Sequence, residues 1–211
     1  TAGPTFESID PVRFIGNHSS GKMGICIAER LIQLGANVHL VLGPSNETHP
    51  SNCKVTRVTS AQDMIEACQT AFEYSDGLIM AAAVADYRPK TIHPSKIKKD
   101  DSELTIELVT NPDILKILSL KKTEKQFCVG FALETNNQEE YARKKLNEKQ
   151  LDIVKEPAIA TSNTKYISSK TGKQIPKDQY DLENKSGYQT EDGNNQLGGQ
   201  GSTKEKEDDE S

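Results

Sequence analysis

A continuous apolar run at residues 77–83, Gly-Leu-Ile-Met-Ala-Ala-Ala, constrains the fold of this chain more than any other segment. The run has no polar side chain that could face water, so it predicts a β-strand covered on both faces of its sheet. Strand and helix patterns alternate on both sides of it, up to about residue 154. This alternation predicts an α/β fold of three layers, a Rossmann-like arrangement in which helices cover both faces of a mostly parallel sheet.

The segments around this run give the order of the expected elements. Further strands are expected at residues 37–42, 55–58, 127–132 and 151–154, and helices before Gly35, after Ser60, at 111–120 and at 138–150. Residues 96–99 and 104–109, with polar residues between them, predict a short two-stranded arm. Residues 1–5 resemble the end of a first strand whose apolar residues are missing, which would leave its two neighbours unpaired.

Composition divides the chain into three regions. Residues 1–155 hold the alternating pattern and are expected to form the ligand-binding domain, and residues 156–183 are ambiguous. Residues 184–211 are poor in apolar side chains and rich in Gly, Asn, Gln and charged ones. Such a segment cannot bury enough surface to offset its ordering entropy, so a disordered C-terminal tail is predicted there.

Charge and hydropathy exclude several classes of partner. The 211 residues carry a net charge of −5 with acidic and basic residues mixed, which argues against a nucleic-acid surface. No apolar run approaches the ~20 residues that a membrane helix needs, and no signal peptide is visible. The four cysteines form no Cys-x-x-Cys pair, which suits a reducing compartment. We therefore expect a cytoplasmic protein that binds neither membrane nor nucleic acid.

The stretch at residues 10–24, Asp-Pro-Val-Arg-Phe-Ile-Gly-Asn-His-Ser-Ser-Gly-Lys-Met-Gly, is the first candidate site. A Gly/Ser loop before a helix offers unpaired N–H groups and the positive end of the helix dipole to an anion. Its spacing fits a nucleotide P-loop, but Met23 replaces the Ser or Thr that would bind Mg²⁺. No dinucleotide Gly-x-Gly-x-x-Gly is present either. A phosphate cradle and a plain helix cap both stay open.

Carboxylate and lysine candidates follow from the expected topology, because ligands of parallel α/β sheets bind beyond the carboxyl ends of the strands. Asp86 comes soon after the 77–83 run and is a candidate Mg²⁺ ligand, ribose contact or solvated turn residue. Lys96 lies in the expected arm, and Lys145 and Lys149 lie one helical turn apart. Alone each lysine is typical of a surface, but together with Asp86 and a phosphate cradle they suit a nucleoside triphosphate.

Motifs in a fixed order resemble one known family. They are Thr-Ala-Gly-Pro-Thr (1–5), Asp-Pro-Val-Arg-Phe (10–14), Asn-His-Ser-Ser-Gly-Lys-Met-Gly (17–24), Ala-Ala-Val-Ala-Asp-Tyr-Arg (82–88), Lys-Ile-Lys-Lys (96–99), Asn-Pro-Asp-Ile (111–114) and Val-Gly-Phe-Ala (129–132). Together they resemble phosphopantothenoylcysteine synthetase (phosphopantothenate–cysteine ligase) of coenzyme A biosynthesis, in its bacterial, CTP-dependent form. The resemblance extends from residue 1 to about residue 154.

The resemblance implies an acid–amino-acid ligase that joins 4′-phosphopantothenate to cysteine. CTP would activate the acid as an acyl-cytidylate with release of pyrophosphate, and the cysteine amine would then displace CMP. The resemblance also implies Mg²⁺, a homodimer, and association with a flavin-dependent phosphopantothenoylcysteine decarboxylase. Residues 1–155 would then be the nucleotide- and phosphopantothenate-binding ligase domain.

Residue by residue, the resemblance assigns Asn17 to the reacting acyl group and Lys96 to nucleotide phosphate during turnover, with Arg13 supporting the Asn17 loop. It assigns the nucleotide site to Ala82, Asp86, Lys96, Pro112, Asp113, Ile114, Leu115, Phe131, Lys145 and Lys149. The physics of anion binding, rather than the resemblance, predicts the substrate's own phosphate at Ser19, Ser20 and Gly21.

The chain departs from the family pattern after residue 154. The stretch at residues 155–165 is shorter than usual and lacks a Gly-rich loop. This departure supports a second hypothesis, a degenerate or truncated nucleotide-binding module of the same fold without turnover. The presence of Asn17, Asp86 and Lys96 favours the ligase, and a nicotinamide dehydrogenase is a distant third because its glycine fingerprint is missing.

Overall fold

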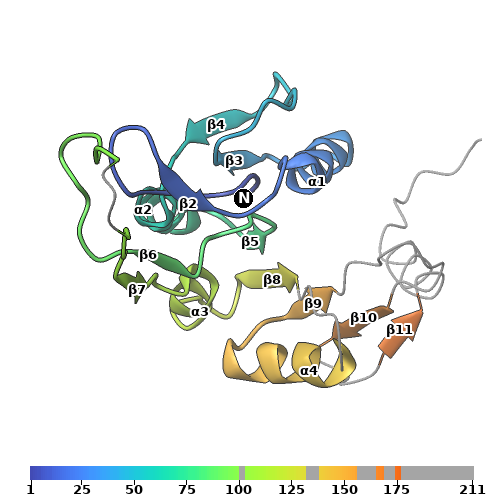
Figure 1. Ribbon diagram of the computed structural model, residues 1–211. Coiled ribbons are helices and arrows are strands. Elements are labelled where there is room, and N and C mark those ends of the chain that lie inside the picture. The colour runs from blue at the N-terminus through green and yellow to red at the C-terminus, as the bar shows by residue number, and fades with distance from the viewer. Residues whose placement is uncertain (100–102, 132–137, 156–164, 169–173, 177–211) are drawn as a thin grey trace, which may run out of the picture. The chain divides into compact units, whose positions relative to one another are not determined.

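The computed structural model describes residues 1–99, 103–131, 138–155, 165–168 and 174–176, so the tail expected at 184–211 lies outside the described residues. In chain order the elements are β1 (Phe6–Ser8), β2 (Phe14–Gly16), α1 (Lys22–Gln33), β3 (His39–Leu42), β4 (Lys54–Arg57), α2 (Ala61–Phe72), β5 (Gly77–Met80), β6 (Tyr87–Pro89), β7 (Leu108–Thr110), α3 (Ile114–Ser119), β8 (Phe127–Phe131), α4 (Gln138–Glu148), β9 (Ile153–Lys155), β10 (Lys165–Ser168) and β11 (Gln174–Pro176) (Figure 1).

The main sheet has the strand order β11-β10-β9-β8-β5 and is parallel from β9 to β5. Strands β5, β8 and β9 pair in parallel, β10 and β11 continue the sheet in antiparallel pairing, and β3 pairs in parallel with β4. Residues 1–5 connect these two groups of strands, because Ala2 bridges to Leu42 of β3 and Pro4 bridges to Ala83 after β5. The expectation that the neighbours of a first strand would be unpaired is therefore wrong, since short extended backbone fills the gap.

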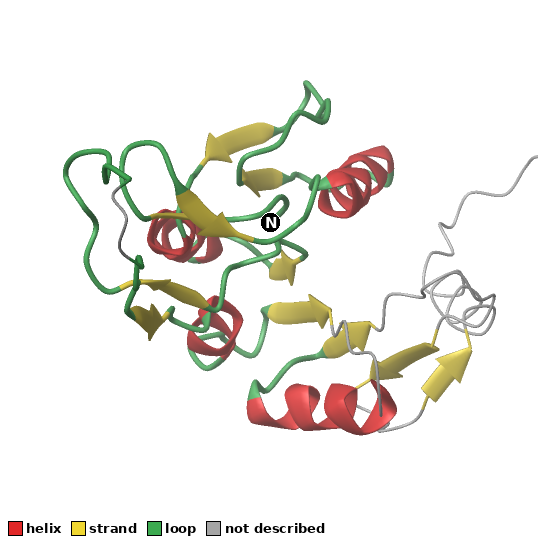
Figure 2. Ribbon diagram, viewed as in Figure 1, coloured by secondary structure: helices red, strands yellow, loops and turns green. Residues whose placement is uncertain are grey.

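The side chains of β3 show that both faces of the sheet are covered. Val41 packs in the larger core with side chains of α2, α3 and β8, whereas Leu40 and Leu42 pack in a second cluster with Ile25 and Ala28 of α1. Alternate residues of a strand point to opposite faces, so α1 covers one face and α2 and α3 the other (Figure 2). The three-layer, Rossmann-like prediction is confirmed.

The start of α2 follows directly from its sequence. The Ser60 hydroxyl accepts a hydrogen bond from the Asp63 N–H at 3.1 Å, and the Asp63 carboxylate accepts one from the Ser60 N–H at 2.9 Å. This reciprocal capping box satisfies two N–H groups that a helix start leaves unpaired. Glu7 of β1 accepts a third, from the Ala61 N–H at 2.9 Å, and so connects the helix start to the β1–β2 hairpin.

The two-stranded arm exists, but its strands are not the predicted ones. The paired strands are β6 and β7, with Tyr87 opposite Thr110 and Pro89 opposite Leu108. Residues 96–99 lie in the loop beyond this pair and form no strand, so the predicted pairing of 96–99 with 104–109 is wrong. At the base of the loop the Lys90 N–H donates to the Glu107 carbonyl at 2.9 Å, and the two exposed side chains form an ion pair at 2.7 Å.

Candidate functional site

The loop after β5 is the centre of the candidate site. The Asn17 side chain extends from the loop after β2, and its Nδ2 donates to the carbonyl oxygens of Ala83 at 3.3 Å and Val84 at 3.0 Å. The Ala83 N–H in turn donates to the Gly3 carbonyl, and the Ala85 N–H to the Thr5 hydroxyl, both at 2.9 Å. The loop that leads to Asp86 is therefore fixed from two sides.

Asn111, which follows β7, also holds the loop that leads to Asp86. Its Nδ2 donates to the Ala85 carbonyl at 2.8 Å, and its backbone N–H donates to the Asp86 carbonyl at 2.7 Å. Arg88 donates to the Asn111 side-chain oxygen at 3.2 Å and to the Thr110 carbonyl at 2.7 Å. These contacts bring two predicted regions, residues 82–86 and residues 112–115, next to one another.

The predicted phosphate cradle lies at the start of α1. The Ser19 hydroxyl accepts from the Gly21 N–H at 3.3 Å and the Ser20 hydroxyl from the Lys22 N–H at 3.2 Å, and Ser45 donates to the Ser20 carbonyl at 2.6 Å. A hydroxyl that accepts a hydrogen bond still has its own O–H to donate, so both serines could bind an anion. Gly21 has a φ of +84°, which glycine adopts without strain.

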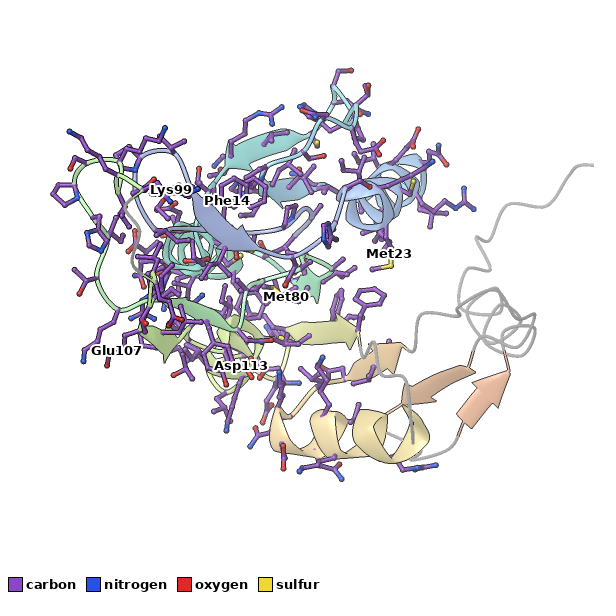
Figure 3. The ribbon with its side chains drawn as sticks, viewed as in Figure 1. Phe14, Met23, Met80, Lys99, Glu107 and Asp113 are labelled. Carbon is purple, nitrogen blue, oxygen red and sulfur yellow. The ribbon has the colours of Figure 1, made fainter. Side chains whose placement is uncertain are left out.

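Two of the predicted nucleotide-site residues form an ion pair at the start of α3. Lys149 Nζ lies 2.7 Å from Asp113 Oδ2, and Asp113 Oδ1 caps the helix by accepting from the Lys116 N–H at 3.1 Å. Burial acts to raise the pKa of Asp113, but the hydrogen bonds from Lys149 and Lys116 and the charge of Lys145 outweigh it, so the pKa is lowered. Figure 3 shows Asp113 where the chain enters α3.

The side chains of Ile114 and Leu115 cannot contact a ligand. They are 2 % and 6 % exposed and belong to the core, where Leu115 packs against the backbone of Gly130. If these positions contact a nucleotide, they do so through their main chain. Lys145 instead directs its ammonium to the carbonyl of Phe131, at the end of β8.

Asp86 and Lys96 present their charged groups to solvent. Both side chains are exposed, and within the described ranges neither forms a hydrogen bond or ion pair. The same part of the chain contains no group of three His, Cys, Asp or Glu side chains arranged to hold a metal. Mg²⁺ often takes one or two protein carboxylates and completes its shell with substrate phosphates and water, so a single exposed Asp86 fits that cation.

Sequence reasoning missed two residues that organise the site. The sequence indicates Asn111 only as the start of a helix, whereas the structure caps α3 with Asp113 and uses the Asn111 amide to hold Ala85 in place. The sequence motifs assign no role to Asp10, but its buried carboxylate accepts from the N–H groups of Val12 and Arg13 at 2.8 and 2.9 Å. Asp before Pro commonly folds its side chain back onto the following N–H groups, and that local signal could have identified Asp10. Arg13 pairs with Asp10 and donates to the Ile97 carbonyl, and among the described residues it forms no hydrogen bond with Asn17.

Comparison with known proteins identifies the family. The profile of DFP, the DNA/pantothenate metabolism flavoprotein C-terminal domain, matches residues 1–184. The chain belongs to this family. The resemblance drawn from the motifs is thereby confirmed. Among the helices of the described part of this DFP domain, none has the length and apolar character needed to cross a bilayer.

Relatives of this DFP domain include two bacterial proteins named coenzyme A biosynthesis bifunctional protein CoaBC. The Vibrio vulnificus protein is 52% identical over 156 residues, and the Bacillus subtilis protein is 51% identical over 155. Each alignment covers 73% of this chain but only 39% and 38% of the relative, so the chain spans about two fifths of their length. The crystal structure of the C-terminal domain of CoaBC matches with a TM-score of 0.72 and 44% identity, over 83% of this chain and 82% of that one.

Proposed function

We propose that this DFP domain is a phosphopantothenate–cysteine ligase of coenzyme A biosynthesis. The similarity to the C-terminal domain of CoaBC supports it. The single observation that carries the proposal is the position of Asn17, whose amide is bonded to the carbonyls of Ala83 and Val84, three and two residues before Asp86. The Asn17 amide thus lies against the loop that carries the exposed Asp86, beyond the carboxyl end of β5, where this fold binds ligands.

The proposed reaction has two steps. In the first, the carboxylate of 4′-phosphopantothenate attacks the α-phosphorus of CTP, so that a C–O–P bond forms and pyrophosphate leaves. In the second, the cysteine amine attacks the acyl carbon, the amide C–N bond forms, and CMP leaves with the former bonding pair. Asn17 Nδ2 is occupied by two carbonyls, so its Oδ1 is the group left for substrate. Such an acceptor can orient an N–H of the attacking amine.

Cations of the chain would neutralise the triphosphate. Lys96 is exposed and without a partner among the described residues, so its ammonium can move to the nucleotide phosphates. Lys145 and Lys149 lie beside Phe131 and Asp113, respectively, and would hold the rest of the nucleotide. Mg²⁺, when bound, would shield phosphate charge, and Asp86 would supply an oxygen to it.

The remaining substrate would extend toward α1. Its phosphate suits Ser19, Ser20 and the N–H groups that follow Gly21, because the helix dipole favours an anion there. CTP as the nucleotide, a homodimer, association with the flavin-dependent decarboxylase and a cytoplasmic location stay predictions from the resemblance.

Lys96→Gln separates the ligase from a module that only binds nucleotide. Glutamine keeps much of the length of the side chain but removes the charge, which acts more on the transition state than on bound CTP. We expect product formation to fall at least ~100-fold while the Kd for CTP changes far less. Pyrophosphate release with CTP, phosphopantothenate and cysteine measures the first quantity, and calorimetry measures the second.

Lys121→Gln is the matched control for this experiment. Lys121 is exposed and lies before β8, at the opposite end of the strands from the site, so its loss of charge should change neither quantity. Unchanged turnover in Lys96→Gln would remove Lys96 from the chemistry. Absence of pyrophosphate release in the wild-type chain, with CTP still bound, would favour the module without turnover.

A further inference from the structure

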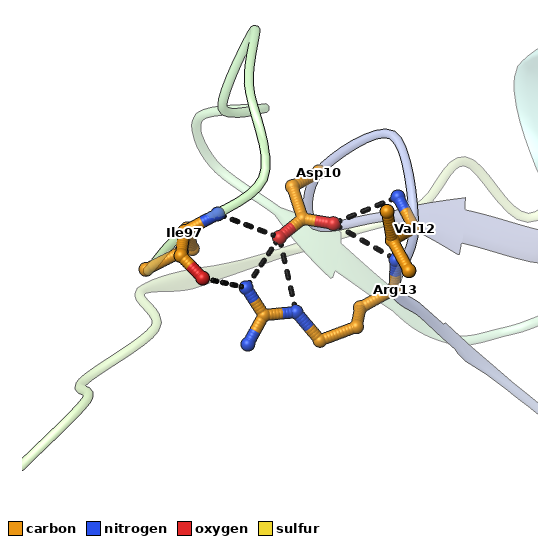
Figure 4. Close-up of polar contacts among 4 residues, drawn as sticks. All are labelled: Asp10, Val12, Arg13 and Ile97. Atoms are coloured by element: carbon orange, nitrogen blue, oxygen red, sulfur yellow. Dashed lines mark hydrogen bonds and ion pairs between the residues drawn. The ribbon is translucent and has the colours of Figure 1, made fainter. Parts of the chain in front are cut away.

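The loop that carries Lys96 is held at the next residue, Ile97. The Ile97 N–H donates to Asp10 Oδ2 at 3.1 Å, and the Ile97 carbonyl accepts from Arg13 Nη2 at 2.8 Å (Figure 4). Both backbone groups of one residue are thus bonded to the two members of an ion pair. Hydrogen bonds to charged groups are about twice as strong as neutral ones, so this contact can restrain an otherwise exposed loop.

The ion pair itself is rigidly built. The Asp10 side chain is fully buried, and it accepts from the N–H groups of Val12 and Arg13 as well as from the Arg13 guanidinium. The Arg13 hydrogen bond, and then the backbone N–H groups of Val12, Ile97 and Arg13, hold the pKa of Asp10 well below its ordinary value against the opposing effect of burial. The carboxylate is therefore ionised throughout the neutral range.

A second contact joins the same two segments. The His93 N–H donates to the Ile9 carbonyl at 2.9 Å, four residues before the contact at Ile97. The turn at residues 9–13 therefore holds the arm at two points. It continues directly into β2, which leads to Asn17. One short segment thus connects the two side chains that the resemblance assigns to catalysis.

We propose that Asp10 is a positioning residue that, together with Arg13, sets the location of Lys96 by holding the backbone of Ile97. The Cα atoms of neighbouring residues are 3.8 Å apart, so fixing Ile97 fixes the base of the Lys96 side chain. Only the flexible stem of the lysine is then left to search for phosphate, which lowers the entropic cost of bringing its charge to the nucleotide. The effect on turnover rests on the proposed function, but the holding of the loop does not.

Asp10→Asn tests the proposal with two independent readouts. The substitution is near-isosteric, but it either turns an NH₂ group toward the donors of Arg13 and Ile97 or leaves them without a charged acceptor. Trypsin cleavage after Lys96, Lys98 and Lys99, followed by mass spectrometry, should accelerate about tenfold or more, because cleavage requires local opening of the chain. In the pyrophosphate assay kcat should fall about tenfold or more, while KM for CTP changes less than about threefold.

Glu107→Gln is the matched control. Like Asp10→Asn, this substitution converts a carboxylate to an amide. Glu107 lies next to β7, at the base of the loop that contains Ile97, so the change breaks the exposed ion pair with Lys90 but leaves the hydrogen bonds of Ile97 intact. Exposed ion pairs contribute little, so cleavage should change less than about twofold. If Asp10→Asn does not fold, as judged by circular dichroism, Ile97→Pro is the second variant: it keeps Asp10 and Arg13, removes the N–H donor of residue 97, and should accelerate cleavage after Lys98 and Lys99.

The outcomes separate the two claims. Cleavage rates equal to wild type in the folded Asp10→Asn or Ile97→Pro chain would overturn the holding of the loop. Faster cleavage with wild-type kcat would overturn the positioning role. If the wild-type chain shows no ligase activity, the proposed function fails, and the protease comparison still decides whether Asp10 and Arg13 hold the arm.

Discussion

Asn17→Asp is the substitution for which the structure gives the sharpest expectation. The two side chains have nearly the same shape, but the Asn17 amide nitrogen donates to two carbonyl oxygens, at 3.3 and 3.0 Å. In aspartate an anionic oxygen would face those carbonyls, so both hydrogen bonds are lost and the side chain is repelled. The loop at residues 17–21 should then detach from the loop that follows β5.

The magnitude follows from these contacts. Each neutral hydrogen bond contributes about 0.5–1.5 kcal/mol net, and an exposed pair lies at the lower end, so about 1 kcal/mol of folding free energy should be lost. For a domain of this size that corresponds to a fall in Tm of roughly 2–4 °C. The effect on chemistry should be larger, about 10²–10³-fold in kcat, because a catalytic group displaced by an ångström loses its alignment.

Thermal unfolding by circular dichroism and pyrophosphate release together test this expectation. Asn37→Asp provides the control, because it makes the same chemical change at an exposed residue before β3, at the opposite end of the strands. Turnover of Asn17→Asp within twofold or so of wild type would refute the reasoning, as would a loss of turnover that Asn37→Asp shares equally.

Two further predictions concern close packing and thiol chemistry. Gly43→Ala should destabilise the fold by about 1–3 kcal/mol or prevent folding, because a Cβ there would lie 1.9 Å from the Pro4 carbonyl oxygen. Gly35→Ala is the control, because its Cβ would meet no neighbour within 4 Å and the substitution should cost only the strain of its positive φ. Urea unfolding of both variants measures the difference in their stability. Iodoacetamide should label the exposed Cys26 in the folded protein and spare Cys128, because burial raises the pKa of the Cys128 thiol to about 11. Labelling of the native protein at pH 7.5, followed by peptide mass spectrometry, tests this prediction. Equal labelling rates at Cys128 and Cys26 would contradict it.

The sequence predicted the elements whose signals are local. The apolar run at residues 77–83 contains β5, and Ser60 caps α2, because a run of apolar side chains and a capping residue are each visible within a few residues of sequence. The β1–β2 hairpin was missed, since its three-residue strands are too short for a period to show. The stacking of Phe6 on Phe14, with ring centroids 3.9 Å apart, becomes visible only in three dimensions.

The site was predictable as a set of residues but not as a set of contacts. The motifs predict Asn17 and Asp113 as site residues, and the structure connects each of them to a partner distant in sequence. Asn17 bonds to residues 66 and 67 positions away, and Asp113 pairs with Lys149, the residue that follows α4. Such pairings depend on how helices and loops pack, which no local pattern encodes.

The backbone of the loop after β5 is bonded almost entirely to distant parts of the chain. Ala83 forms hydrogen bonds with Gly3 and Asn17, and Ala85 forms them with Thr5 and Asn111. The partners that bond through a side chain are 26 to 80 residues away in sequence. Contacts of such long range form late, after the entropy of closing large chain loops has been lost. The loop therefore acquires its shape only when the central sheet is complete, and partly folded chains cannot bind a ligand there. A ligand bound there would stabilise the domain as a whole, so its affinity could be measured as a rise in the Tm of global unfolding.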